Sequence, residues 1–218
     1  RRYGFAGDST RCVDDFQIDL LCGGSQKAVS APPGLTFVVV SDDAKEKMKN
    51  RKTPIASFYA NLMAFDGYYE KKWFPYTMPI SDIYGLRAAF NLIAGDKTLY
   101  ERHARIGSAT RAAVKEAGLK LHLQSGYSNT VTVFDIPECT DAKSILDEMR
   151  TKYNIMLAGS FDELSGKVIR IGHMGENARL EHMVPALEAL SATLTDLGVT
   201  LQGNLADLFL KHYREFQD

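Results

Sequence analysis

The chain has 218 residues, 45% of them hydrophobic and 24% charged, which is enough to bury a core in one domain or in two small ones. Its net charge of -1, and the lack of any apolar run near the roughly 20 residues of a membrane span, argue against nucleic acid and membranes as partners. Three cysteines without paired spacing and five scattered histidines predict neither a disulfide framework nor a metal site, so we expect a cytoplasmic protein that holds no metal.

The first part of the chain is expected to combine loops with short strands. Residues 1–17 are rich in glycine and charge and predict a loop, whereas residues 18–22 predict a short buried strand. The unbroken apolar run of residues 35–40, rich in β-branched side chains, predicts a central strand covered on both faces. Ser41 then offers an N-cap for a short helix over residues 44–49.

Residues 50–80 are irregular in pattern and rich in large rings. A loop of this composition usually packs against another surface, often a second subunit. The rings are Phe58, Tyr59, Phe65, Tyr68, Tyr69, Trp73, Phe74 and Tyr76. Beyond them, apolar residues recur at helical spacing over residues 81–117, with an interruption at Gly95-Asp96. This long helical segment is expected to connect two domains.

The remainder of the chain predicts a compact second domain. Strands are expected over residues 119–123, 130–136, 155–158 and 167–171, and helices over residues 141–152, 179–197 and 204–216. Strands and helices in this order predict an α/β domain with a mostly antiparallel sheet.

Lys27 is the first residue that suggests chemistry. It follows Gly23-Gly24-Ser25-Gln26, directly after the strand predicted at residues 18–22. Burial at the end of a strand disfavours the charged ammonium, so the amine can act as a nucleophile, as Schiff-base lysines do. The alternative is a lysine that extends from a loop into solvent, as most lysines do.

Two further residues add to this chemistry. Thr77 precedes the long helical segment, where a hydroxyl and unpaired N–H groups suit a phosphate, or else Thr77 or Ser81 simply caps the helix. Arg170 alternates with Ile169 and Ile171 and should face away from them; its planar fork suits a carboxylate, or else it pairs with a neighbouring glutamate. An amine nucleophile, a phosphate-binding site and a guanidinium that can bind a carboxylate together match a pyridoxal phosphate (PLP) enzyme acting on an amino acid.

Several motifs, in their order along the chain, resemble one family of such enzymes. They are Ser25-Gln26-Lys27, Pro32-Pro33-Gly34-Leu35, Phe74-Pro75-Tyr76-Thr77-Met78-Pro79, Tyr84-Gly85-Leu86-Arg87 and Arg170-Ile171-Gly172. Over essentially the whole chain they resemble the class V aminotransferases, and most closely the alanine–glyoxylate and serine–glyoxylate (serine–pyruvate) branch. A cysteine desulfurase of the same fold would typically carry His at the position of Gln26.

The resemblance implies an α/β enzyme of PLP fold type I, of which this chain resembles the C-terminal part only. Residues 1–80 would be the C-terminal portion of the large PLP-binding domain, residues 81–117 the connecting helix, and residues 118–218 the small C-terminal domain. The resemblance further implies a homodimer in which each site is shared across the interface.

The same resemblance assigns roles to the candidate site residues. Lys27 would hold PLP as an internal aldimine and would move the proton at the substrate α-carbon. Ser25 and Gln26 would contact the cofactor, with Gln26 beside its phosphate. Thr77 would reach the phosphate bound in the neighbouring subunit, and Arg170 would grip the substrate carboxylate.

The implied reaction is a ping-pong transamination between a small amino acid (alanine or serine) and a small 2-oxo acid (glyoxylate or pyruvate). A 2-aminophosphonate–pyruvate transaminase is an alternative. The chain departs from the family pattern at Phe74, where some relatives carry Tyr, and it lacks the Asp that pairs with the pyridine nitrogen. Four aspartates stand too close to Lys27 to serve: Asp8, Asp14, Asp15 and Asp19. The 218 residues alone are therefore expected to be inactive, as a non-catalytic fragment lacking the first half of the enzyme.

Overall fold

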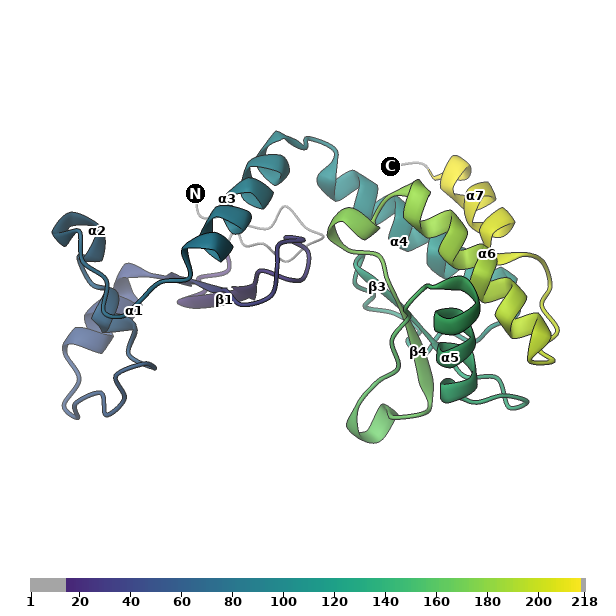
Figure 1. Cartoon of the computed structure of the whole chain (residues 1–218), viewed down its shortest axis with the longest axis horizontal. Helices are drawn as coiled ribbons and strands as arrows, with labels where there is room; N and C mark the ends of the chain where they lie inside the picture. Colours follow the sequence, from purple (N-terminus) through teal and green to yellow (C-terminus); the bar gives the residue numbers. More distant parts are fainter. Residues whose placement is uncertain (1–14, 217–218) are drawn as a thin grey trace. The chain divides into compact units, whose positions relative to one another are not determined.

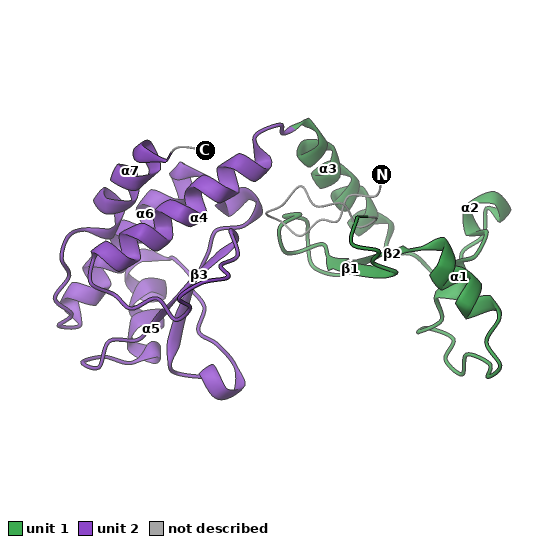
Figure 2. Ribbon diagram, turned by 180° about the vertical axis from the view of Figure 1, so that it is seen from behind, with its two compact units in different colours: residues 1–5, 10–95 green, residues 6–9, 96–218 purple. Residues whose placement is uncertain are grey.

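The computed structural model describes residues 15–216, and these divide between Gly95 and Asp96 into two compact units (Figures 1 and 2). The division coincides with the interruption expected within the long helical segment. Domain boundaries at residues 80 and 117 stay predictions. Residues 1–14 of the loop predicted over residues 1–17 lie outside the described residues.

The first unit begins with a two-stranded antiparallel sheet. Strand β1 (Leu20–Gly24) pairs with strand β2 (Thr36–Val40), with Leu20 opposite Val40. The prediction that both strands are buried is wrong for the described chain, because Leu20 is 54% exposed and Val38 is 41% exposed. In a sheet of two strands, each strand leaves one edge unpaired, and here the faces are only partly covered.

Helices follow the sheet in this unit. Helix α1 (Asp42–Lys49) is capped by Ser41, whose Oγ accepts a hydrogen bond of 3.0 Å from the Ala44 N–H, as the sequence predicts. Helix α3 (Ile80–Gly95) packs on β2, since the rings of Phe37 and Phe90 meet edge to face at 5.7 Å. Two short helices, η1 (Leu62–Phe65) and α2 (Tyr68–Lys71), come between α1 and α3 along the chain.

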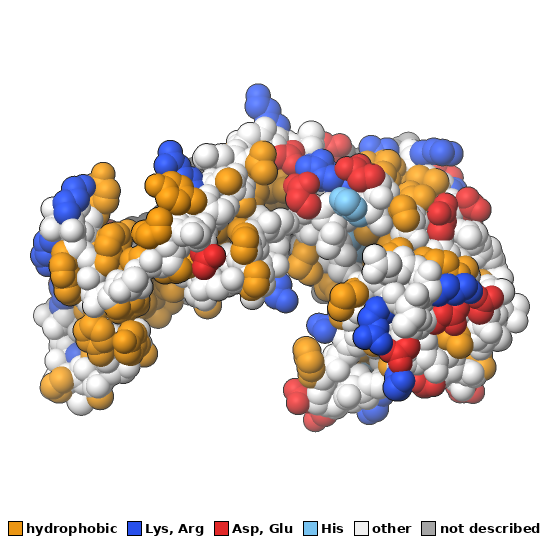
Figure 3. Space-filling view, viewed as in Figure 1, with side chains coloured by type: hydrophobic (Ala, Val, Ile, Leu, Met, Phe, Trp, Pro, Cys, Tyr) orange, Lys and Arg blue, Asp and Glu red, His pale blue; other side chains and the backbone are white. Residues whose placement is uncertain are grey.

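The aromatic residues of 58–76 form a surface of this unit, here called the aromatic surface. Its rings pack on one another, for example Tyr59 on Tyr76 at 5.3 Å and Tyr68 on Phe74 at 5.5 Å. Most of them nevertheless remain open to solvent, and Figure 3 shows hydrophobic side chains gathered over the part of the unit that carries α1 and α2. Its exposed large side chains are Phe58, Tyr59, Leu62, Tyr68, Tyr69, Trp73 and Phe74.

The second unit is built from the helices that the sequence predicts after residue 98. Their amphipathic patterns bury one side of each, and side-chain caps at Asp141 and Asn204 define where two of them begin. The helices are α4 (Leu99–Glu116), α5 (Ala142–Tyr153), α6 (Leu180–Asp196) and α7 (Leu205–Glu215), with short turns η2 (Asp162–Leu164) and η3 (Gly175–Asn177).

The sheet of the second unit is antiparallel, as predicted, but smaller. Strands β3 (Val131–Asp135) and β4 (Val168–Gly172) pair directly. The strands predicted at residues 119–123 and 155–158 are reduced to single bridges, Leu121 with Phe134 and Ala158 with Arg170. A glycine follows each bridge, at Gly126 and Gly159, and glycine disfavours a continued strand.

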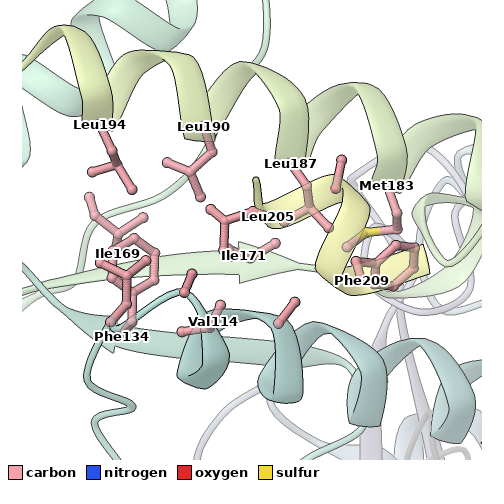
Figure 4. Packing of buried hydrophobic residues seen from close by; sticks show 14 of the residues in the cluster. Val114, Phe134, Ile169, Ile171, Met183, Leu187, Leu190, Leu194, Leu205 and Phe209 are labelled. Carbon is pink, nitrogen blue, oxygen red and sulfur yellow. The ribbon is translucent and has the colours of Figure 1, made fainter. Parts of the chain in front are cut away.

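The core of the second unit lies between this sheet and its helices. Figure 4 shows Leu187, Leu190 and Leu194 of α6 pointing toward Ile169 and Ile171 of β4. All five side chains are buried. Because side chains alternate along a strand, Arg170, which lies between the two isoleucines, is on the opposite face of the sheet.

Candidate active site

Lys27 lies on a turn between β1 and β2 that closes on itself through backbone hydrogen bonds. The N–H of Ser25 donates to the carbonyl of Leu35 at 3.0 Å, and the N–H of Ala31 donates to the carbonyl of Ser25 at 3.0 Å. The N–H of Ser30 donates to the carbonyl of Lys27 at 2.9 Å. We call residues 25–31 the lysine turn; its backbone fixes where the Lys27 side chain starts.

The hydroxyl of Ser25 ties this turn to the segment that follows. Ser25 is fully buried, its Oγ donates to the carbonyl of Pro32 at 2.6 Å, and it accepts from the N–H of Leu35 at 3.3 Å. Gln26 folds back, because its Oε1 lies 2.7 Å from the point where a Cβ on Gly24 would stand. Ser25 therefore acts within the turn, whereas Gln26 is exposed beside it.

The amine of Lys27 is open to solvent. Its side chain is exposed, and it forms no ion pair with any residue from 15 to 216. The expectation that a buried strand would desolvate this lysine is therefore wrong for the described chain. The faces of the two-stranded sheet are only partly covered, so β1 and the turn that follows it both meet solvent. An unpaired amine on a fixed turn is available to react with a carbonyl compound.

Thr77 belongs to the same unit and precedes α3. It is exposed, and its hydroxyl makes no hydrogen bond within the described part of the chain. Ser81 likewise makes none there, so neither hydroxyl supports the alternative of a simple helix cap. The Thr77 hydroxyl is thus free to meet a ligand oxygen.

Arg170 lies in the middle of β4, opposite Val133 of β3 and bridged to Ala158. It faces away from the buried Ile169 and Ile171, as predicted. Its Nε donates to the carbonyl of Gly159. No carboxylate in residues 15–216 forms an ion pair with it, so the alternative of an arginine matched by a glutamate is not observed there.

A buried histidine holds the end of β4 close to Arg170. His173 is fully buried; its Nδ1 lies 3.1 Å from the Asn129 carbonyl, and its Nε2 lies 2.8 Å from the Thr132 hydroxyl. Because a carbonyl can only accept, Nδ1 carries the proton and Nε2 accepts from the hydroxyl. Burial lowers the pKa of His173 to about 4, so the ring is neutral near pH 7.

The structure thus brings Ser25, Gln26 and Lys27 into one turn, places Thr77 in the same unit, and places Arg170 in the other unit. Sequence patterns missed the buried hydroxyl of Ser25 and the ring of Phe161, whose centroid lies 5.4 Å from Cζ of Arg170. Only through-space distances reveal such contacts. Within residues 15–216 no helix is long and apolar enough to span a membrane, and no cluster of His, Cys, Asp or Glu could hold a metal ion.

Comparison with known proteins identifies the family. The sequence model of the family "Aminotransferase class-V" matches residues 8–151. The chain belongs to this family. Enzymes of the class V family depend on pyridoxal phosphate, and the solved structures similar to this chain confirm the α/β fold predicted from the sequence.

Individual class V relatives are similar along most of the chain. An uncharacterized aminotransferase of Methanocaldococcus jannaschii is 37% identical over 85% of this chain and 49% of its own length. The serine–glyoxylate aminotransferase of Arabidopsis thaliana is 35% identical over 92% of this chain and 52% of its own. The crystal structure of ureidoglycine–glyoxylate aminotransferase from Bacillus subtilis superposes with a TM-score of 0.90, at 30% identity, over 96% of this chain and 56% of that one. The chain spans about half the length of these relatives.

Side chains of the lysine turn, together with Thr77, fit the cofactor of this class V family. An aldehyde requires an accessible amine, which Lys27 presents without an ion-pair partner among the described residues. A phosphate requires hydrogen-bond donors, which the exposed amide of Gln26 and the unbonded hydroxyl of Thr77 can supply. The donor set is therefore of the kind that pyridoxal phosphate needs.

Proposed function

We propose that the protein to which these 218 residues belong is a PLP-dependent aminotransferase that moves the amino group of a small amino acid, alanine or serine, to a small 2-oxo acid, glyoxylate or pyruvate. The observation that carries the proposal is the lysine turn, which presents an unpaired amine in a chain of the class V family. Glyoxylate appears in the names of the Arabidopsis and Bacillus relatives, which supports it as the acceptor.

Lys27 would perform the covalent and proton-transfer work. When bound, PLP supplies an electron sink for the carbanion that forms at the α-carbon of an amino acid. Nζ of Lys27 would attach the cofactor and would then remove and return the proton at that α-carbon. In a ping-pong exchange, the first 2-oxo acid leaves before the second one binds.

Gln26 and Thr77 would hold the cofactor phosphate, Thr77 from the neighbouring subunit of a homodimer. The exposed, unbonded hydroxyl of Thr77 and the exposed aromatic surface support this arrangement. A direct contact of Ser25 with the cofactor stays a prediction. Free thiols at Cys22 and Cys139 fit a reducing compartment, and the cytoplasm is the proposed location.

Arg170 would bind the carboxylate shared by amino acids and 2-oxo acids. Its Nε is occupied by the Gly159 carbonyl, which leaves the two terminal amino groups of the guanidinium for a ligand. Two parallel N–H groups match the two oxygens of a carboxylate.

The assignment of Lys27 is tested by intact mass and absorbance of the PLP-loaded protein before and after borohydride reduction. We expect a band near 400 nm that reduction fixes on Lys27 as a mass increase of the peptide containing it. Lys27→Ala should abolish both signals, whereas Lys47→Ala, at an exposed lysine of the same unit, should keep them. An unchanged band in Lys27→Ala would refute the assignment, and a protein without any band after added PLP would be a non-catalytic fragment.

The assignment of Arg170 is tested by steady-state kinetics. Arg170→Lys keeps a charge but loses the planar fork, so we expect KM for alanine and for glyoxylate to rise by about tenfold or more. A wild-type KM in this variant would move the carboxylate site elsewhere. Activity with 2-aminoethylphosphonate in preference to alanine and serine would favour the phosphonate alternative.

A further inference from the structure

The ring of Phe161 lies beside the guanidinium of Arg170. Its centroid is 5.4 Å from Cζ of Arg170, within the range of a cation–π contact. Phe161 stands at the beginning of η2, in the connection between α5 and β4, and is 73% exposed. A large apolar side chain so exposed contributes little to the core, so replacing it should leave the core intact.

One short segment constrains Arg170 at three points. The Arg170 N–H donates to the carbonyl of Ala158 at 2.7 Å, its Nε donates to the carbonyl of Gly159, and the Phe161 ring lies beside its Cζ. These contacts fix the backbone, the orientation about the side-chain axis and one flank of the guanidinium. The two terminal amino groups have no partner within the described residues, so they remain for a ligand.

The residues paired with Arg170 in the sheet are apolar. Its neighbours across the strands are Val133 on one side and Ala158 on the other. A carboxylate held by the fork would therefore have its remaining groups next to hydrocarbon. The cations nearest on this face, Lys120 and His122, are already paired with Asp135, at 2.8 Å and 2.7 Å. A second carboxylate beside the ring would lose hydration without gaining a cation there, whereas a methyl group would gain an apolar contact.

We propose that Phe161 is a specificity-determining residue: its ring orients the Arg170 guanidinium and favours monocarboxylates with a small apolar substituent over dicarboxylates. This inference rests on the proposed role of Arg170 in binding the substrate carboxylate. It narrows the substrate class to alanine-like amino acids and their 2-oxo acids. An exposed cation–π contact corresponds to about a two- to fivefold change in affinity.

The test measures competitive inhibition constants in the PLP-loaded protein. Propionate presents a carboxylate with a methyl-bearing carbon, and succinate presents two carboxylates; neither can react. Phe161→Ala should raise the inhibition constant of propionate by about two- to fivefold and should reduce the preference for propionate over succinate. Phe161→Tyr keeps the ring and should recover most of the lost affinity, while Phe161→Leu keeps only the apolar contact and should recover part of it.

Kinetics separate this role from a general effect on folding. The change in Phe161→Ala should fall on KM for alanine more than on kcat, with an unfolding temperature close to wild type because the ring is exposed. Wild-type inhibition constants for both acids in Phe161→Ala would overturn the inference. If Arg170→Lys weakens both acids while Phe161→Ala weakens neither, only the role of Phe161 fails; if Arg170→Lys is also without effect, the carboxylate assignment itself fails.

Discussion

Replacing Gly23 by alanine tests whether the entrance to the lysine turn depends on close packing. Gly23 pairs directly with Phe37 across the two strands, and the Phe37 ring folds over the glycine. An added Cβ would stand 2.3 Å from Cζ and 2.4 Å from Cε2 of that ring. Carbon atoms in contact are about 3.5–4.0 Å apart, so the ring must retreat by about 1 Å or more.

The retreat has a cost because Phe37 also packs edge to face on Phe90 of α3. Overpacking of this kind typically costs about 1–3 kcal/mol, and the tip of a half-buried ring belongs at the low end. At about 2–4 °C per kcal/mol for a domain of 150–250 residues, we expect the unfolding temperature of Gly23→Ala to fall by several degrees. Because β1 leads directly into the lysine turn, the variant should also retain less PLP.

Differential scanning fluorimetry and PLP absorbance measure both effects. Gly95→Ala is the matched control, since a Cβ there meets nothing within 4 Å and the residue ends a helix. It should be neutral or slightly stabilising. In a Phe37→Leu background, Gly23→Ala should cost less, because the clashing ring is gone. Equal costs of Gly23→Ala in both backgrounds would refute the steric reasoning.

Three further expectations concern stability. Ser25→Ala removes a buried hydroxyl with two hydrogen bonds and should cost about 1–2 kcal/mol, seen as a lower unfolding temperature and faster PLP loss; unchanged values would contradict its role in the lysine turn. The pKa of His173 is lowered to about 4 by burial, below its unfolded value, so stability should fall as the pH drops from about 6.5 toward 4. His173→Gln should show a shallower fall over that interval, and an equal slope would contradict the assignment. Asn204→Ala removes the cap of α7 and should cost about 1 kcal/mol in denaturant unfolding, whereas a neutral result would show that the cap is dispensable.

The features that sequence predicted well are those that neighbouring residues determine. The helices capped by Ser41, Asp141 and Asn204 begin where local hydrogen bonds and apolar spacing place them. The side of β4 on which Arg170 lies follows from alternation with two buried isoleucines. In both cases the controlling residues lie within a few positions along the chain.

The features that sequence missed depend on residues far apart. An apolar run shows that a strand can be buried, but not how many strands pair with it or what covers its faces, which is why β1 and β2 are more exposed than expected. Residues 119–123 alternate like a strand, yet they pair with β3 only through a single bridge, Leu121 with Phe134. Lys27 is predicted from its place after a glycine-terminated strand, and Ser25 and Gln26 follow from family resemblance. The contact of Phe161 with Arg170 leaves no signature in the sequence.

The hydrogen bonds that close the lysine turn bear on how the protein folds. The two made by the Ser25 hydroxyl span only seven and ten positions of the chain. Loops of this length close quickly and at a small entropic cost, so the turn can form before contacts between distant parts of the chain exist. The nucleophile is then carried by an early, local structure. Because mutations outside an early-forming structure mainly speed unfolding, substitutions far from this turn should leave the folding rate nearly unchanged.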